Sequence, residues 1–276
     1  MAIITFRSNE KKETGQTLSI AAVATHMAIE HNYKILVVST NFKDQSLEEC
    51  FWDVNKTVGL INKPGTVGIE SGVEGLMRVI ASNRTSPEIV KNYSKIILKD
   101  RLDVLPSPVA TEYKDYEAVL ESYPDVLQLA NRYYDMVFVD LSRRMSERYA
   151  ENIIQISDVV VVNLTQRLRN IDEFIELREA EEFYKRNHIM LLIGRYDAYS
   201  KYNTKNITRY LKERKPVGVI PYNTLFFEAC SEAKIIDFFL KLKNVDEADR
   251  NHLFVKEVGN FGNSIIYKLQ ELQMKL

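Results

Sequence analysis

The sequence is poor in cysteine, with only Cys50 and Cys230 among 276 residues. The two lie far apart along the chain and match no spacing of metal ligands. The sequence therefore predicts neither a disulfide framework nor a cysteine-based metal site. Reduced thiols in a cytoplasmic protein are the interpretation that follows.

A net charge and a long apolar run are also missing. Lysine and arginine number 37 against 38 aspartates and glutamates, which gives a net charge of -1. This balance excludes a strong overall attraction to nucleic acid or anionic lipid. No stretch reaches about 18 uncharged apolar residues, and the first residues lack the cationic and apolar pattern of a leader. We therefore expect no transmembrane segment, no cleavable signal and a cytoplasmic location.

Repeats, low-complexity tracts and breaks in composition are absent too, so residues 1–276 are predicted to form a single domain. With 45% hydrophobic residues, the chain can bury a full core. Short apolar, β-branched segments alternate with helical ones, which is typical of right-handed βαβ crossovers. The prediction is an α/β fold with a mostly parallel central sheet and helices on both faces.

The segments that carry this prediction can be given by their residues. The predicted strands are Ala2–Phe6, Lys34–Ser39, Arg101–Leu105, Met136–Asp140, Asp158–Asn163, His188–Ile193 and Val217–Ile220. The predicted helices are Thr17–His31, Gly72–Ser82, Pro87–Leu98, Asp115–Arg132, Ser146–Ile156, Asn170–Arg186, Asn203–Glu213, Leu225–Ala233 and one within Asn263–Leu276.

The segment between the first strand and the first helix has the place of a phosphate-binding loop but lacks its lysine. In such a loop, G-x-x-x-x-G-K-[ST], backbone amides and the lysine hold phosphate while the hydroxyl ligates magnesium. Gly15 and Thr17 match, whereas Gln16 takes the position of the lysine and Lys11 that of the first glycine. A lysine at that first position is typical of the deviant loop K-G-G-x-G-K-[ST]-[ST], aligned over Lys11–Leu18.

Six segments, taken in order, resemble the MinD/ParA class of deviant P-loop ATPases: Lys11–Leu18, Lys34–Asn41, Arg101–Pro106, Tyr134–Asp140, Ser157–Val162 and Val219–Asn223. The resemblance covers most of the chain. It implies a P-loop NTPase fold, binding of ATP or ADP with Mg2+, and a homodimer with nucleotide held between the subunits. The stretch from Gly75 to Pro106 looks most like the TadZ/CpaE-type branch, whose members localise pilus-assembly machinery.

The resemblance also implies which residues form the nucleotide site. The expected loop contacts are Lys11, Glu13, Thr14, Gly15, Gln16, Thr17 and Leu18. The residues expected beside the base are Arg195, Pro221, Tyr222 and Asn223. The residues expected at the magnesium site are Thr17 and Asp140. The residues expected at the catalytic positions are Lys11, Asn41 and Asp44. Structural alternatives stay open: Gly15 and Thr17 also suit a helix cap, Asp44 a surface loop and Asp140 a structural carboxylate.

Three departures from the family pattern make hydrolysis doubtful. Gln16 carries no charge to neutralise a terminal phosphate or its transition state, although its amide can donate to phosphate oxygens. Asn41 stands where the family has an aspartate, and an amide accepts no proton at neutral pH. Glu13 adds a negative charge to a site for anions. Asp44, three residues beyond Asn41, is the candidate substitute for the missing carboxylate.

Three functions are compatible with these residues. The first is a nucleotide-binding or pseudo-ATPase scaffold that dimerises and localises a membrane-associated machine, such as pilus assembly, through protein partners. The second is an active ATP-hydrolysing switch in which Lys11 supplies the electrostatic work. The third is a DNA-binding partition-type protein that uses the basic clusters Arg143–Arg144, Arg167–Arg169 and Lys212–Lys215. At the C-terminus, an apolar stripe predicts a helix docked on the core rather than a membrane anchor: Ile265, Leu269, Leu272 and Leu276.

Overall fold

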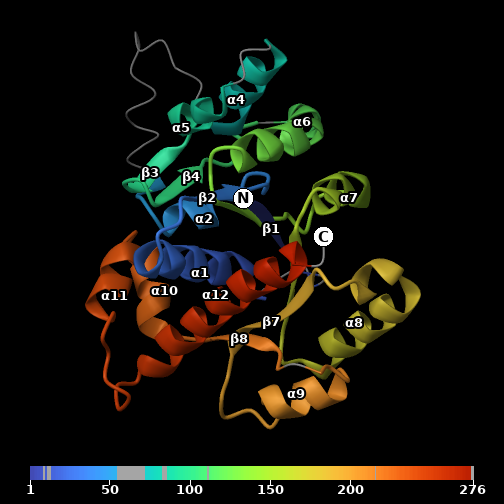
Figure 1. The fold of residues 1–276 in the computed structure, drawn as a ribbon, viewed down its shortest axis with the longest axis vertical. Coiled ribbons are helices and arrows are strands. Elements are labelled where there is room, and N and C mark those ends of the chain that lie inside the picture. Colours follow the sequence, from blue (N-terminus) through green and yellow to red (C-terminus); the bar gives the residue numbers. More distant parts are fainter. Residues whose placement is uncertain are drawn as a thin grey trace.

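A computed structural model of the chain describes residues 1–8, 10, 14–54, 72–82, 86–110, 112–214 and 216–274. Within these ranges the element order alternates between strands and helices, as the sequence predicted. Figure 1 shows α4, α5 and α6 gathered at one end of the molecule and α8 and α9 at the other. No helix in the described ranges combines the length and the apolar character needed to span a membrane.

The described strands form one sheet in the order β3-β4-β2-β5-β1-β6-β7-β8. Their bounds are β1 Ala2–Arg7, β2 Ile35–Ser39, β3 Lys95–Leu98, β4 Leu102–Leu105, β5 Met136–Asp140, β6 Val159–Leu164, β7 Ile189–Tyr196 and β8 Gly218–Pro221. Neighbouring strands pair in parallel, except that β3 runs antiparallel to β4 at the edge. The predicted α/β fold with a mostly parallel sheet is confirmed.

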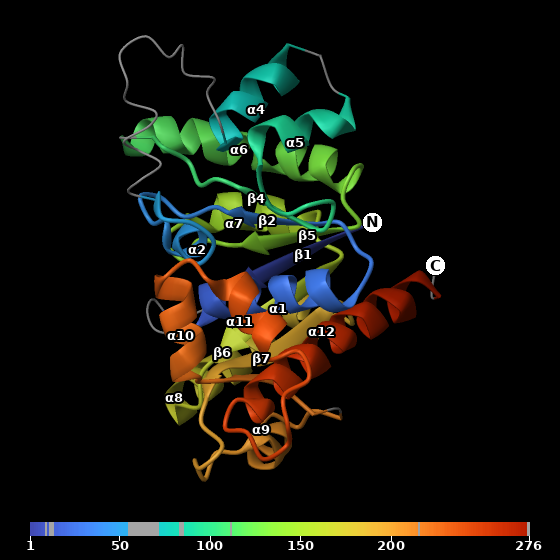
Figure 2. The same cartoon turned by 90° about the vertical axis from the view of Figure 1, so that its left-hand side faces the viewer.

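The helices lie on both faces of this sheet. Their bounds are α1 Gln16–Glu30, α2 Ser46–Glu49, α4 Gly72–Ala81, η1 Pro87–Ile89, α5 Val90–Tyr93, α6 Tyr113–Asn131, α7 Glu147–Gln155, α8 Leu168–Ala180, η2 Glu182–Lys185, α9 Thr204–Tyr210, α10 Thr224–Ser231, α11 Ile235–Lys241 and α12 His252–Gln273. Figure 2 looks onto the face covered by α1, α10, α11 and α12. The opposite face is covered by α4, α6 and α7.

Side-chain alternation along the central strand divides the core into two layers. Ile4 and Phe6 of β1 point into the cluster under α1 and α12, whereas Ile3 points into the cluster under α6 and α7. All three are buried because β1 lies between β5 and β6. Such two-sided burial explains why the strands are apolar runs rather than alternating ones.

The segment Pro87–Leu98 is the main error of the sequence prediction. A helix was expected throughout, but it ends at Tyr93, and Lys95–Leu98 forms the edge strand β3. An apolar run such as Ile96-Ile97-Leu98 suits either state, and pairing with β4 decides for the strand. The short helices α2 and α11 were also missed.

The C-terminal helix α12 is docked on the core, as predicted. Ile265 is fully buried, and Leu269 and Leu272 pack against the cluster around α1. Leu276 lies outside the described residues. The docked apolar stripe is therefore covered by the protein itself.

The two cysteines are neighbours in the fold, although 180 positions separate Cys50 from Cys230. Both are free and buried, and Cys50 also donates to the carbonyl oxygen of Ser46 at 3.3 Å. A hydrogen bond with Cys50, together with burial, raises the pKa of the Cys230 thiol far above its usual range. The fold thus brings together two thiols that lie far apart in the sequence, and their reduced state stays a prediction.

The carboxyl end of β1 is the point where the order of the sheet reverses. Strands β2 to β5 lie on one side of β1, and β6 to β8 lie on the other. In open α/β sheets, ligands bind in the crevice at such a point. The loop between β1 and α1 leaves the sheet there.

Candidate functional site

The loop between β1 and α1 is described at Ser8, Glu10, Thr14 and Gly15. Lys11 and Glu13 lie outside the described residues, so the roles assigned to them stay predictions. Leu18, also expected in the loop set, packs its side chain against the core cluster under α1. Among the described residues, the groups that could contact a ligand here are the backbone at the start of α1 and the polar side chains around it.

Gly15 ends the loop in a backbone conformation that favours glycine. Its φ is +74°, and an added Cβ would lie 2.8 Å from Cγ of Arg195. Gly194 meets the loop equally closely, because a Cβ there would lie 2.1 Å from the carbonyl oxygen of Thr14. The loop is therefore pressed against the end of β7, with no space for larger residues at either position.

Asn163 on β6 fixes the loop from the side and was missed by the sequence analysis. Its Nδ2 donates to the carbonyl oxygen of Thr14 at 2.8 Å, and the residue is fully buried. A polar side chain after four consecutive valines, Val159 to Val162, was the available signal. Buried amides are retained where they satisfy a partner, here the loop backbone.

Asp140, at the end of β5, is the centre of the site. Its carboxylate is fully buried and accepts three hydrogen bonds. Oδ1 accepts from Nε2 of Gln16 at 2.6 Å, and Oδ2 accepts from Oγ1 of Thr17 at 2.8 Å and Nδ2 of Asn41 at 3.2 Å. Burial raises the pKa of Asp140 to about 6, against the lowering effect of the bonds from Thr17 and Gln16. The resemblance assigned these four residues to one nucleotide site, and the structure brings their side chains into direct contact.

Gln16, in the position of the missing lysine, turns toward the sheet. Its Nε2 donates to Asp140 and, at 3.0 Å, to the carbonyl oxygen of Leu141. Both amide hydrogens are thereby used, so none remains for a phosphate oxygen. Its Oε1 is buried and has no hydrogen-bond partner among the described residues.

Asn41 is held in the same way on the neighbouring strand end. Its Nδ2 donates to Oγ of Ser39 at 3.2 Å as well as to Asp140. Asp44, the candidate substitute carboxylate, accepts from the backbone N and the hydroxyl of Ser46 at the start of α2. The carboxylate of Asp44 is thus used in a local turn that begins a helix.

The base side of the site brings two of its four predicted residues together. The guanidinium of Arg195 lies over the ring of Tyr222, 5.7 Å from its centroid. Asn223 caps α10 by accepting from the backbone N of Phe226 at 2.8 Å, and its amide donates to Asn251. Pro221 is buried as the last residue of β8. Arg195 and Tyr222 therefore form the exposed face available to a base, because the Asn223 amide is already bonded.

Glu48 on α2 is a further buried carboxylate that the sequence analysis missed. It accepts from the backbone N of Ser107 at 2.5 Å and from the Ser107 hydroxyl. Burial, with a smaller contribution from Asp140, raises the pKa of Glu48. The contact ties α2, which follows Asn41, to the chain after β4. A lone glutamate in a four-residue helix gave no sequence signal for this role.

A phosphate group fits the loop. The hydroxyls of Ser8 and Thr14 are buried and have no hydrogen-bond partner among the described residues. They flank the loop at the N-terminus of α1, where free backbone amides and the helix dipole favour an anion. Hydroxyls can donate to phosphate oxygens, so these orphaned groups suit a nucleotide phosphate.

Magnesium does not fit the same arrangement. The metal needs oxygen ligands in octahedral geometry and keeps several waters, which must donate to acceptors around it. Three of the roughly four acceptor positions on Asp140 are taken by protein donors. The side chains of Gln16 and Asn41 present amide hydrogens to the carboxylate, which are not metal ligands.

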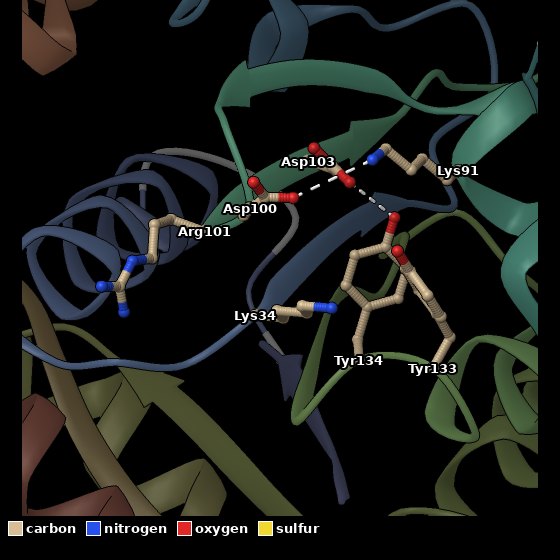
Figure 3. Close-up of a pocket in the computed structure, with 7 residues that line it drawn as sticks. All are labelled: Lys34, Lys91, Asp100, Arg101, Asp103, Tyr133 and Tyr134. Carbon is tan, nitrogen blue, oxygen red and sulfur yellow. Dashed lines mark hydrogen bonds and ion pairs between the residues drawn. The ribbon is translucent and has the colours of Figure 1, made fainter.

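A small pocket lies at the amino-terminal ends of the strands, opposite the loop (Figure 3). Its lining residues are Lys34, Lys91, Asp100, Arg101, Asp103, Tyr133 and Tyr134. Its volume is about 10 Å³, which suits one water molecule. The hydroxyl of Tyr134 donates to Asp103 at 2.7 Å, and Lys91 pairs with Asp100 at 3.9 Å. The pocket is a small, internally paired feature of the strand ends.

In structure, the chain is similar to several solved ATPases. The ParA family ATPase from Chlorobium tepidum superposes with a TM-score of 0.69 and 15% sequence identity, over 95% of this chain and 98% of that one. MinD from Pyrococcus horikoshii, complexed with Mg-ADP, superposes with a TM-score of 0.63 and 14% sequence identity, over 97% of this chain and 98% of that one. A chain of the MinC:MinD cell division complex from Aquifex aeolicus superposes with a TM-score of 0.61 and 12% sequence identity, over 96% of this chain and 96% of that one.

No protein-family model matches the chain, and no curated protein matches it by sequence. The chain therefore has the fold of these MinD and ParA ATPases, which confirms the fold implied by the resemblance, whereas the TadZ/CpaE-type branch stays a prediction. The bound nucleotide and the partner protein belong to those other structures.

Proposed function

We propose that this protein is a nucleotide-binding, pseudo-ATPase scaffold of the MinD/ParA type. The observation that carries the proposal is the attachment of both Gln16 and Asn41 to Asp140. These are the two positions at which an active relative is expected to have a lysine and an aspartate. Neutral amides occupy both, and each amide is bonded to the protein.

Hydrolysis needs groups that the described site does not supply at Gln16, Asn41 or Asp44. Phosphoryl transfer depends on cations that neutralise the terminal phosphate and on a residue that orients water. The Gln16 amide is neutral, Asn41 accepts no proton, and Asp44 is engaged with Ser46. The hydroxyls of Ser8 and Thr14, which can donate hydrogen bonds to phosphate, and the N-terminus of α1 persist. Binding of ATP or ADP is therefore retained, while turnover is slow.

Dimerisation and partner docking are the output of such a scaffold. A MinD relative is seen assembled with MinC, a protein partner. By analogy, we infer a cytoplasmic homodimer whose nucleotide state controls docking to partners of a membrane-associated machine. Pilus assembly is the process indicated by the TadZ/CpaE-like stretch of the sequence.

DNA binding is the weaker alternative, because members of the basic clusters already have protein partners. Arg143 donates to the carbonyl oxygen of Glu10 at 3.0 Å, and Arg169 pairs with Glu173 at 2.9 Å. Exposed pairs of this kind are typical of solvated helix faces. Salt-sensitive retention on duplex DNA, lost in an Arg167→Glu, Arg169→Glu variant, would instead establish the partition-type function.

Nucleotide binding and hydrolysis are tested separately on the full chain. Thermal unfolding and calorimetry with ADP and ATP are expected to show binding, since a ligand specific for the folded state raises the melting temperature. Phosphate release is expected to stay at background. Gln16→Lys is expected to change binding or turnover, whereas Gln270→Lys, the same change on the exposed face of α12, is expected to change neither.

Two results would overturn the proposal. One is the failure of both nucleotides to bind. The other is turnover at the rate of active relatives that is abolished by Lys11→Ala, which would make the protein an ATP-hydrolysing switch.

A further inference from the structure

The carboxylate of Asp140 is held from three sides by uncharged donors. Gln16 comes from the start of α1, Thr17 follows it, and Asn41 comes from the end of β2. These contacts join segments 124 and 99 residues apart in sequence. Two of the three donors are amides whose hydrogens are both committed to the protein.

We propose that this protein binds nucleotide phosphates without magnesium, because the amides of Gln16 and Asn41 take the place that a hydrated metal ion would need beside Asp140. The inference rests on the proposed nucleotide binding and adds its metal dependence. It concerns the same loop but a different property, so the metal independence can fail while the proposed nucleotide binding stands.

The two amides act as an internal substitute for a cation. They hold the buried carboxylate by hydrogen bonds, which lowers the need for a counter-ion beside it. For the water ligands of a metal ion to reach Asp140, the hydrogen bonds from Gln16 and Asn41 to its carboxylate must break. Gln16, which is buried, would then keep only its bond to Leu141 and have one amide hydrogen without a partner, a state that proteins avoid. Asn41 would keep only its bond to Ser39.

The phosphate itself finds donors that do not involve a metal. Thr14 is 1% exposed and Ser8 is 7% exposed, and neither hydroxyl has a partner among the described residues. They stand at the two ends of the loop: Ser8 follows β1, and Thr14 precedes the 15-residue helix α1 by one residue. Hydroxyl and backbone donors together supply the neutral hydrogen bonds that a metal-free phosphate requires.

Asn41→Asp is the variant that should reverse this preference. It replaces an amide donor by a second carboxylate facing Asp140, and two carboxylates at that distance repel unless a cation lies between them. The double variant Gln16→Lys, Asn41→Asp restores the charges typical of the family. Asn263→Asp, the same change at an exposed position of α12, is the matched control.

The experiment titrates ADP into the full chain by calorimetry, once with excess EDTA and once with MgCl2. For wild type, binding is expected to be no tighter in MgCl2 than in EDTA, since Mg2+ also binds ADP in solution and competes with a metal-free site. Changes around a metal typically alter its affinity by about 10- to 100-fold. Magnesium is therefore expected to tighten ADP binding at least about tenfold in the double variant and not to tighten it in the Asn263→Asp control.

Mn2+ provides a readout that does not depend on turnover. Free Mn2+ gives an electron paramagnetic resonance signal that is lost on binding. Relative to the same mixture of Mn2+ and ADP without protein, wild type is expected to leave the signal unchanged, and Asn41→Asp is expected to reduce it.

Each outcome decides the question. ADP binding by wild type in EDTA, with no uptake of Mn2+, supports the inference. Binding that requires magnesium overturns it and leaves the scaffold function standing. Absence of ADP binding in both conditions overturns both. Because wild type alone decides between these results, a variant that fails to fold does not remove the test.

Discussion

Substitution of Asp140 by asparagine removes a fully buried charge, and its effect on stability depends on pH. The carboxyl has a usual pKa of 3.8, and burial raises the pKa of Asp140 to about 6 in the folded protein. Between these values the folded state holds a proton that the unfolded chain has released. Stability then falls as the pH rises, because the unfolded state binds fewer protons.

The size of the effect follows from the two pKa values. They differ by about two, and each pKa unit is worth about 1.4 kcal/mol, so burying the charge costs about 3 kcal/mol above pH 6. An asparagine has no charge to bury. It keeps an acceptor for Gln16, while Asn41 keeps its bond to Ser39. The changed hydrogen bonds add an offset that does not vary with pH.

The assay is urea unfolding of wild type and Asp140→Asn at several pH values from 4 to 8. The free energy of unfolding of the variant, minus that of wild type, is expected to rise by about 2 kcal/mol between pH 4 and pH 6.5 and then level off, because part of the difference already develops below pH 4. Asp125→Asn, on the exposed side of α6, controls for loss of a carboxylate at the surface. A difference between Asp140→Asn and wild type that stays constant across the range would refute the reasoning.

Three further predictions concern other parts of the fold. Gly194→Ala is expected to destabilise the protein by about 1–3 kcal/mol and to weaken ADP binding, because its Cβ would lie 2.1 Å from the carbonyl oxygen of Thr14. Unfolding curves and calorimetry check it, and an unchanged variant contradicts the close packing. Tyr134→Phe is expected to cost about 1.5–3 kcal/mol in urea unfolding at pH 7, since it removes a hydroxyl bonded to the buried carboxylate of Asp103. Both cysteines are expected to resist a thiol reagent in the native protein and to react in urea, because they are buried and free; rapid native labelling would contradict this.

The strands show how much of the fold could be predicted from local sequence. The apolar, β-branched segments Ala2–Phe6 and Asp158–Asn163 become β1 and β6 with shifts of one residue, because each is buried on both faces wherever it lies in the sheet. Lys95–Leu98 was misassigned because its composition suits a helix or a strand. Its pairing with β4, an interaction outside its own sequence, decided the outcome.

The site divides in the same way between local and distant information. The sequence by itself determined that Gln16 stands where the loop motif has a lysine and that Asn41 stands where the family pattern has an aspartate. Both statements need only the residue type at an aligned position of a motif. Only the tertiary structure decided that both amides reach the same carboxylate. That convergence requires the ends of β2 and β5 and the start of α1 to meet, and strand order in the sheet, rather than any local pattern, brings them together. The tertiary structure thus turned a loop that lacks its lysine into one whose buried acid is held by the protein's own amides.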